Sequence, residues 1–411
     1  MQQDFQIQRL GHHGDGIAEG PSGPVYVPMT LPGERVSGTL SGDRLEGVKI
    51  LDPSEQRVAA PCRHFRSCGG CAVQHAGEDY VAAWKRGIVE VALKGQGLEA
   101  VISGVATSPA QSRRRASLSA RKTKGGALAG FHGRASGAIV EVPDCQLLHP
   151  ALMRALPVAE GLARVGGARK GEISVLATLS EAGLDISVTD GKPLDEPLRM
   201  ELTSAAQELD LARLSWDGEL IVTRNPPFQR FGRAQVVPPP GAFLQATHHG
   251  EQTLLAEVLR ITRGSKRVVD LFAGCGTFAL PISERAEVLA VEGDRAMTAA
   301  LEEGWRRAGG LHALKAQVRD LFRNPLEGED FKGIDAAVID PPRAGAEAQT
   351  RALAEARVPV IAAVSCNPVT FARDARLLLE AGYDMGEVLV VDQFRWSPHV
   401  EVVAGFSLNK S

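Results

Sequence analysis

The sequence is short of several features that define whole classes of protein. It has no apolar run near the ~20 residues that a membrane-spanning helix requires, and Met1 to Asp4 lack the basic and apolar regions of a signal peptide. Its six cysteines are too few for a disulfide scaffold in 411 residues, and in a reducing compartment they indicate metal binding or catalysis. We therefore expect a cytoplasmic protein without membrane contact, and we expect a monomer.

Acidic residues are missing from one part of the chain, although the whole sequence carries a formal net charge of −3. No aspartate or glutamate lies between Glu99 and Glu141. The basic residues of this stretch are Arg113, Arg114, Arg115, Arg121, Lys122, Lys124 and Arg134. The net charge argues against a protein that coats nucleic acid with its whole surface. The stretch is either a solvated face or a track for phosphates, with Arg114, Arg115 and Lys122 as candidate RNA-binding residues.

Residues 1–60 are predicted to form a small β-barrel. Four short extended segments are separated by Gly, Pro or Asp, at Phe5–Leu10, Pro24–Pro28, Glu34–Leu40 and Leu45–Leu51. Short strands at this spacing are typical of barrels of the OB type, which often bind nucleic acids. The stretch from Gly14 to Ala18, followed by Val25-Tyr26-Val27-Pro28, resembles a TRAM domain, a small RNA-binding barrel.

A cluster of cysteines opens the second domain, residues 61–237, whose mixed strand and helix patterns predict an α+β fold. Cys62, Cys68 and Cys71 form a C-x5-C-x2-C run, and Cys145 follows later. Four thiolates can hold either a [4Fe–4S] cluster or a tetrahedral zinc ion, and the spacing does not decide between them. His64 and His75 lie nearby, and we expect them to be surface or supporting residues rather than ligands.

The third domain, residues 238–411, begins at the Pro238-Pro239-Pro240 run. Strand and helix patterns then alternate strictly, which predicts a doubly wound parallel sheet of the Rossmann-like methyltransferase class. Two consecutive extended segments, near Glu387–Phe394 and His399–Phe406, predict an antiparallel hairpin at one edge of this sheet. The whole chain is therefore a multidomain α/β protein.

A glycine-rich turn follows the first strand of this third domain, where such sheets bind their ligands. Gly274 and Gly276 allow close approach of the backbone to a ligand, and Glu292 ends the next strand, where it can accept hydrogen bonds from ribose hydroxyls. Gly274-x-Gly276-x-x-Ala279 also fits a dinucleotide fingerprint, so this turn alone leaves an NAD-linked oxidoreductase open.

Two further loops face the same crevice. Asp340-Pro341-Pro342-Arg343 and Ser365-Cys366-Asn367-Pro368 each follow an apolar strand. A cysteine at a strand end just before a proline favours a catalytic loop over a buried structural thiol. Cys366 is therefore the candidate nucleophile.

With these motifs in place, the whole chain resembles the bacterial RNA uracil-C5 methyltransferases, which form ribothymidine in tRNA and 23S rRNA. The resemblance implies Cys366 as nucleophile, Glu401 as general base and a [4Fe–4S] cluster rather than zinc on the four cysteines. The candidate S-adenosylmethionine residues are Gln245, Phe272, Gly274, Gly276, Thr277, Glu292, Asp320 and Asp340. Thr247 and Thr277 depart from the family, in which asparagine often stands at those positions.

The resemblance also implies the reaction. A thiolate adds to carbon-6 of uracil, carbon-5 takes the methyl group, and a base then removes the carbon-5 proton. Asp340 is expected to orient the base or the cofactor, and Arg343 to meet a phosphate or a pyrimidine oxygen. The substrate is a single-stranded or flipped uridine, with 23S rRNA favoured over tRNA. A non-catalytic iron–sulfur RNA-binding protein is the second alternative beside the oxidoreductase.

Overall fold

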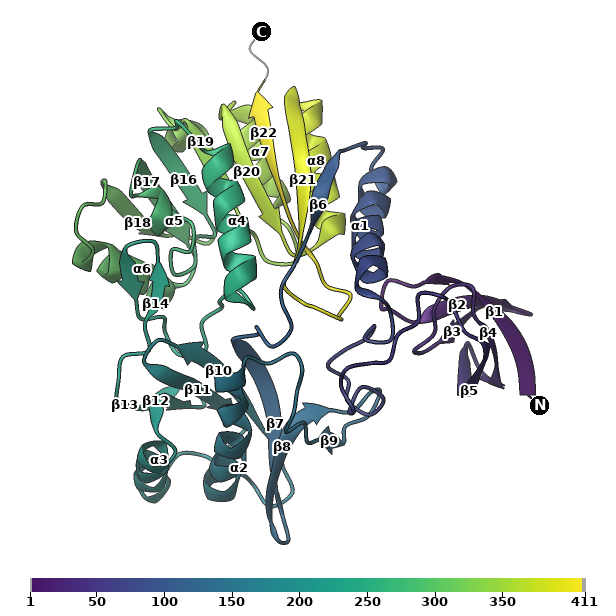
Figure 1. The fold of residues 1–411 in the computed structure, drawn as a ribbon. Helices are drawn as coiled ribbons and strands as arrows, with labels where there is room; N and C mark the ends of the chain where they lie inside the picture. The colour runs from purple at the N-terminus through teal and green to yellow at the C-terminus, as the bar shows by residue number, and fades with distance from the viewer. Residues whose placement is uncertain (1, 409–411) are drawn as a thin grey trace.

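The computed structural model describes residues 2–408. Its N-terminal part is a closed five-stranded barrel, which confirms the predicted barrel (Figure 1). The strands are β1 (Gln2–Leu10), β2 (Gly16–Gly20), β3 (Gly23–Val27), β4 (Arg35–Ser41) and β5 (Arg44–Asp52). Alternating apolar side chains fill the interior, among them Ile7, Val27 and Val36. Strand β2 was not predicted as a strand, since its Gly-rich stretch reads as a turn.

The central part is a seven-stranded sheet with two helices packed on one face. Its strands are β7 (Arg115–Thr123), β8 (Gly126–His132), β9 (Ile139–Val140), β10 (Ile173–Ser180), β11 (Gly183–Thr189), β12 (Leu211–Trp216) and β13 (Glu219–Thr223). The two helices are α2 (Ala155–Gly166) and α3 (Glu196–Glu208), and a short 3-10 helix, η1 (Pro150–Arg154), directly precedes α2. Leu162 of α2 and Leu202 of α3 are fully buried in this core.

The C-terminal part is an eight-stranded sheet in the order β18-β17-β16-β19-β20-β22-β21-β6. Its strands are β6 (Ile102–Thr107), β16 (Arg267–Leu271), β17 (Glu287–Glu292), β18 (Leu314–Val318), β19 (Ala336–Ile339), β20 (Val360–Ser365), β21 (Tyr383–Asp392) and β22 (Glu401–Leu408). Strands β16 to β20 are parallel, and β22 runs antiparallel between β20 and β21. The predicted doubly wound sheet and the closing hairpin are both present.

Helices cover both faces of this sheet (Figure 1). They are α1 (Glu78–Gly95), α4 (His248–Ile261), α5 (Ala279–Ile282), α6 (Arg295–Arg307), η2 (Gly328–Phe331), α7 (Glu347–Glu355) and α8 (Pro368–Glu380). Helices α1, α7 and α8 contribute to the core of one face, and α4, α5 and α6 to that of the other. A short hairpin of β14 (Gln229–Phe231) and β15 (Ala234–Val236) packs on α6.

The structure divides the chain differently from the predicted boundaries in one respect. Helix α1 and strand β6 fall in the predicted central domain, yet α1 packs on α8 and β6 pairs in parallel with β21. Val89, Leu93 and Ile102 are buried in the core of the C-terminal sheet. The closing hairpin therefore does not form the edge of the sheet, because β6 covers it.

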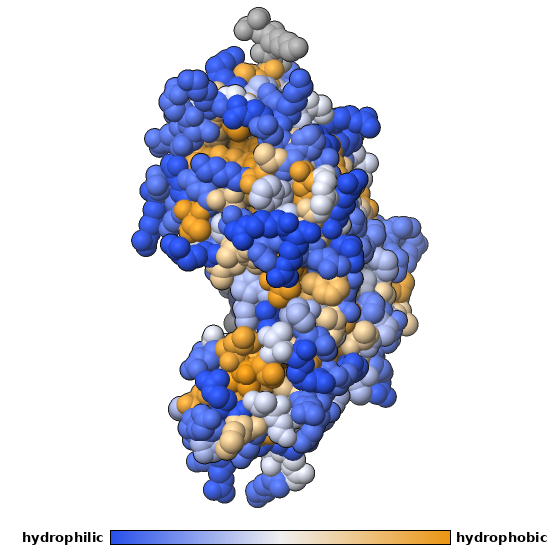
Figure 2. Space-filling view, turned by 90° about the vertical axis from the view of Figure 1, so that its left-hand side faces the viewer, coloured by the Kyte–Doolittle hydropathy of each residue, from blue (hydrophilic) through white to orange (hydrophobic). Residues whose placement is uncertain are grey.

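Two buried ion pairs link segments that are far apart in the sequence. Lys85 of α1 pairs with Asp392 at the end of β21, and both side chains are fully buried. Arg114, just before β7, pairs with Glu251 of α4. Figure 2 shows that the molecule narrows between its C-terminal part, at the top, and its central part below. In the part of the chain that the structure describes, no helix is long and apolar enough to cross a membrane.

Candidate active site

The carboxyl ends of the parallel strands surround a cavity of about 490 Å³. The strand order reverses between β16 and β19, and a crevice opens at such a switch point. The cavity is lined by Phe243, Gln245, Phe272, Gly274, Glu292, Gly293, Met297, Asp320, Leu321, Phe322, Asp340, Pro341, Pro342, Arg343, Cys366 and Glu401. Most of these residues directly follow a strand, so the sheet itself brings them together.

The turn after β16 is held in an uncommon backbone conformation. Phe272 has φ 63° and Gly274 has φ 55°, which is a region that residues with a side chain rarely adopt. The Gly274 N–H donates to Glu292 Oε2 at 2.9 Å, and the Asp294 N–H donates to Oε1 at 2.8 Å. The Phe272 ring contacts that of Phe322, with centroids 5.3 Å apart. A strained aromatic residue on a cavity wall is typical of a ligand site.

Six of the predicted cofactor residues line this cavity, namely Gln245, Phe272, Gly274, Glu292, Asp320 and Asp340. Gly276 and Thr277 are not among the lining residues. Gly276 instead allows close packing, because a Cβ there would lie 2.7 Å from Leu280 Cδ1. The sequence interpretation missed Met297, Leu321 and Phe322. The sequence held one signal for Phe322: this large aromatic residue lies two positions after Asp320, just beyond a strand, where residues of the cavity are expected.

The predicted nucleophile and base lie together at the far end of this cavity. Cys366 follows β20, and Glu401 begins β22 with 2% of its surface exposed. Burial, followed by the charges of Glu401 and Asp340, raises the pKa of the Cys366 thiol to about 11, and Arg343 opposes this rise. Burial, and then the charge of Asp340, raise the pKa of Glu401 well above its usual range. Burial raises the pKa of Asp340 to about 7.

A second cavity, of about 710 Å³, meets the first at these same residues. Four residues line both cavities: Phe243, Arg343, Cys366 and Glu401. From there the second cavity extends past Phe394 and His399 to the predicted metal ligands Cys62, Cys68, Cys71 and Cys145. Cys366 and Glu401 thus stand where the two cavities join.

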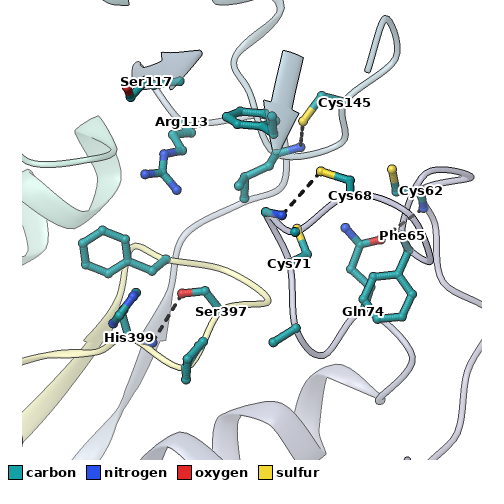
Figure 3. A pocket seen from close by; sticks show the side chains of 18 of the residues that line it. Cys62, Phe65, Cys68, Cys71, Gln74, Arg113, Ser117, Cys145, Ser397 and His399 are labelled. Carbon is teal, nitrogen blue, oxygen red and sulfur yellow. Dashed lines mark hydrogen bonds between the residues drawn. The ribbon is translucent and has the colours of Figure 1, made fainter. Parts of the chain in front are cut away.

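The four cysteines come from two loops and line one side of this cavity, with Arg113 and His399 opposite them (Figure 3). Burial, together with the charges of the other three thiolates, raises the pKa of Cys71 to about 12, so the four sulfurs are within electrostatic reach of one another. All four are free thiols. Within residues 2–408, however, no group of three or more His, Cys, Asp or Glu residues has the geometry to hold one metal ion.

The two histidines near the cysteines have other partners. His64 Nε2 lies 2.8 Å from Asp144 Oδ1. His75 is buried against the ring of Phe65, and burial lowers its pKa to about 4. Neither histidine lines the cavity.

The basic stretch separates into buried and accessible residues, and this corrects one prediction. Arg114 is 9% exposed; it pairs with Glu251 and donates to the Gln245 carbonyl, so it has no surface to offer a phosphate. Arg115 is half-buried over the ring of Phe243. Lys122 lies near the exposed β7–β8 turn, and Arg343 is exposed at the rim shared by both cavities.

Comparisons with known proteins agree with this geometry. A family model described as tRNA (Uracil-5-)-methyltransferase matches residues 311–411. An uncharacterized RNA methyltransferase of Brucella suis biovar 1 is 42% identical over 398 residues, which cover 97% of this chain and 96% of the relative. The 23S rRNA (uracil(1939)-C(5))-methyltransferase RlmD of Chromohalobacter salexigens is 32% identical over 420 residues, 97% of this chain and 87% of the relative.

A solved structure shares the fold over almost the whole chain. It is the Pyrococcus abyssi tRNA (uracil-54, C5)-methyltransferase in complex with S-adenosyl-L-homocysteine. The TM-score is 0.75 at 21% identity, and the match covers 98% of this chain and 99% of that one. The barrel, the central sheet and the C-terminal sheet therefore form an architecture that another protein shares.

Proposed function

Because the chain belongs to the S-adenosylmethionine-dependent RNA uracil-C5 methyltransferases, we propose that it methylates a uridine of 23S rRNA through a covalent adduct between Cys366 and carbon-6. One observation carries the proposal: Cys366 and Glu401 line both cavities, at their junction. The strand-end cavity suits the methyl donor, and the wider cavity suits the flipped nucleotide.

The strand-end cavity fits S-adenosylmethionine, which supplies a methyl group on a sulfonium ion. The Glu292 carboxylate, fixed by two backbone N–H groups, suits ribose hydroxyls. The exposed ring of Phe322 and the thioether of Met297 offer apolar contact to an adenine. Gln245 and Asp340 line the part of the cavity nearer to Cys366 and suit the amino-acid end of the donor. These roles account for three of the predicted residues, namely Glu292, Gln245 and Asp340.

The proposed reaction uses Cys366 first. Its thiolate adds to carbon-6, and the electrons of the carbon-5–carbon-6 double bond move into the uracil ring as an enolate. Carbon-5 then takes the methyl group, and S-adenosylhomocysteine leaves. The high pKa of Cys366 makes its thiolate strongly nucleophilic once formed, and the guanidinium of Arg343 favours that ionised form.

Glu401 acts second. It removes the carbon-5 proton, the double bond re-forms, the bond between sulfur and carbon-6 breaks, and the Cys366 thiolate is regenerated. The proton on Glu401 passes to solvent before the next cycle. A carboxylate with a raised pKa is a stronger proton acceptor than an exposed one. General bases contribute roughly 100- to 10,000-fold to such steps.

We further propose that Cys62, Cys68, Cys71 and Cys145 hold a [4Fe–4S] cluster with a structural role. The thiols influence one another and face one space, which supports a shared group. The cysteine spacing, C-x5-C-x2-C with a later cysteine, resembles that of the iron–sulfur members of the family, which favours the cluster over a zinc ion. In a four-iron cluster each thiolate binds its own iron. The cluster would hold two loops beside the nucleotide cavity.

The preference for 23S rRNA rests on the 23S rRNA methyltransferase of Chromohalobacter salexigens, which matches along 97% of this chain. Phosphate contacts are proposed for Arg115, Lys122 and Arg343, which are at least partly accessible. Arg343 reaches the rim of both cavities. It is placed to bind the enolate oxygen or a neighbouring phosphate of the flipped uridine.

The test compares Cys366→Ala with Glu401→Gln, using labelled S-adenosylmethionine and transcripts of 23S rRNA or tRNA. Mapping of 5-methyluridine in the products identifies the substrate and the position. Cys366→Ala should give no protein–RNA band on a denaturing gel. Glu401→Gln should accumulate a methylated adduct that survives denaturation, because it has the thiol but no base.

Other outcomes are equally informative. An adduct with Cys366→Ala would leave Cys275 as the remaining thiol of the C-terminal part and would overturn the nucleophile assignment. Binding of RNA without any methyl transfer by the unaltered protein would favour the non-catalytic alternative. Methylation confined to the tRNA transcript would reverse the substrate preference while leaving the chemistry in place.

A further inference from the structure

A buried glutamine that the sequence interpretation did not single out connects the base to the cofactor segment. Gln393 follows β21 directly and is 1% exposed. Its Nε2 lies 3.2 Å from Glu401 Oε1 and 2.5 Å from Gln245 Oε1. Its Oε1 accepts the backbone N–H of Ala246 at 2.8 Å. One side-chain amide therefore touches the proposed base and two neighbouring residues of the segment that lines the cofactor cavity.

The hydrogen bonds fix which way this amide points. The Ala246 N–H can only donate, so it must face the oxygen of Gln393 rather than the nitrogen. The two N–H groups of Gln393 then have one acceptor each, Gln245 Oε1 and Glu401 Oε1. Because Gln245 uses its oxygen in this contact, its own NH2 group is left free for the cofactor cavity that it lines.

The surroundings leave Gln393 little freedom to move. Helix α4 approaches it at Gly250, where an added Cβ would lie only 2.7 Å from Gln393 Cβ. The preceding residue, Asp392, is anchored by the buried Lys85. A side chain packed this closely and bonded at every polar atom holds its neighbours in place.

We propose that Gln393 is a positioning residue that couples occupation of the cofactor cavity to the orientation of the Glu401 carboxylate. This inference rests on the proposed function, in which Glu401 removes the carbon-5 proton. With Oε1 held by Gln393, the other carboxylate oxygen is the one available to the substrate. The N–H donated by Gln393 also opposes the rise in the pKa of Glu401 that burial and Asp340 cause.

The experiment replaces Gln393 by Met, which has a similar volume but neither donor nor acceptor for this network. The matched control is Gln349→Met, because Gln349 is also 1% exposed and bonded, to the backbone of Leu326, away from both cavities. Single-turnover reactions with a 23S rRNA transcript carrying tritium at uridine carbon-5 report two steps separately. Methyl transfer is read from labelled S-adenosylmethionine, and proton removal from the release of tritium.

Gln393→Met should slow tritium release and prolong the covalent adduct by about 10- to 100-fold, the cost of a misplaced catalytic group. Methyl transfer should change by less than about threefold, since the thiolate is untouched. The pH at which tritium release is half-maximal should rise, because Glu401 loses a donor to its ionised form. S-adenosylmethionine should bind more weakly, and Gln349→Met should match the unaltered protein in all five measurements.

Equal adduct lifetimes and pH profiles for Gln393→Met and the unaltered protein would overturn the inference, provided that Glu401→Gln still traps the adduct. Absence of an adduct even with Glu401→Gln would instead overturn the proposed mechanism, so the two failures are distinguishable. If Gln393→Met does not fold, as judged by circular dichroism, Gln393→Glu replaces it, since it keeps the shape. A second carboxylate there should move the pH profile upward still further, and an unmoved profile would overturn the inference.

Discussion

The nucleophile end and the cysteine end of the joined cavities are built in different ways. At the nucleophile end, Cys366 and Glu401 sit on the ends of neighbouring strands, and the sheet hydrogen bonds set their positions. At the cysteine end, the four thiols stand on loops. The backbone N–H groups of Gly70 and Leu147 reach Cys68 Sγ at 3.4 Å and Cys145 Sγ at 3.5 Å, and the Gln74 side chain bonds the Cys71 thiol. The sheet therefore sets the first end, whereas loops set the second, and the proposed cluster would tie those loops together.

The largest effect should come from removing one thiol at the cysteine end. Cys71→Ser takes away one of four ligands, so we expect loss of essentially all bound iron from protein purified without oxygen. RNA binding should weaken, because two loops beside the nucleotide cavity lose their common anchor. Iron analysis, visible absorption and RNA titration measure these changes. Cys275→Ser is the matched control, since Cys275 is buried near the other cavity. If the unaltered protein is colourless and contains one zinc ion, the proposed iron–sulfur cluster at the cysteine end is wrong.

At the nucleophile end, the reactivity of the Cys366 thiol should depend on pH, because its surroundings in the folded protein raise its pKa. A thiol with a pKa near 11 is protonated at pH 8, so each unit of increase up to about pH 10 should raise its thiolate fraction about tenfold. Alkylation of Cys366 by iodoacetamide, followed by mass spectrometry, should rise by that factor per unit. Arg343→Met should slow alkylation at pH 8, because it removes the charge that favours the thiolate.

The matched control for this measurement is Arg376→Met, on the exposed face of α8, where the arginine pairs with Glu380. It should alkylate like the unaltered protein at every pH. A flat alkylation profile between pH 7 and pH 9 would show that Cys366 is already ionised and that its neighbours do not hold it protonated.

The smallest effect concerns the way in which RNA reaches the cysteine end. Strand β7 lines this end through Ser117 and runs out to Lys122. Lys122→Met should weaken RNA binding modestly and reduce the salt slope by about 1. Arg114→Met, in the same basic stretch, should leave the slope unchanged. It should instead lower stability by about 3–5 kcal/mol, because it leaves the buried Glu251 unpaired. Equal salt slopes for Lys122→Met and the unaltered protein would show that β7 does not guide RNA.

Much of the C-terminal fold could be predicted, because strand–helix alternation is a local pattern. The residues that end strands, such as Cys366, Asp340 and Glu292, could be assigned to one crevice for the same reason. Strand β6 could not be assigned to this sheet. Ile102 pairs with Val388, and the sequence around Ile102 contains no pattern that indicates pairing with so distant a segment.

The errors at the site have a similar origin. Arg114 was taken for a phosphate-binding residue because its charge is visible in the sequence, whereas its partner Glu251 stands 137 positions away. Gln393 was overlooked because a single glutamine forms no motif. Its proposed role follows from the three groups that its side-chain amide contacts, and these are visible only in the structure. Domain boundaries and location in the cell stay predictions.

The buried pair of Lys85 and Asp392 has a consequence for how the protein is made. The two residues are separated by 307 positions. At a synthesis rate of 5–20 residues per second, Lys85 leaves the ribosome roughly 15–60 s before its partner. During that interval α1 and β6 have no sheet to join, and an unpaired ammonium group and an open strand edge stay exposed to water. Helix α1 and strand β6 can therefore complete their packing only after β21, almost the last strand of the chain, has been synthesised.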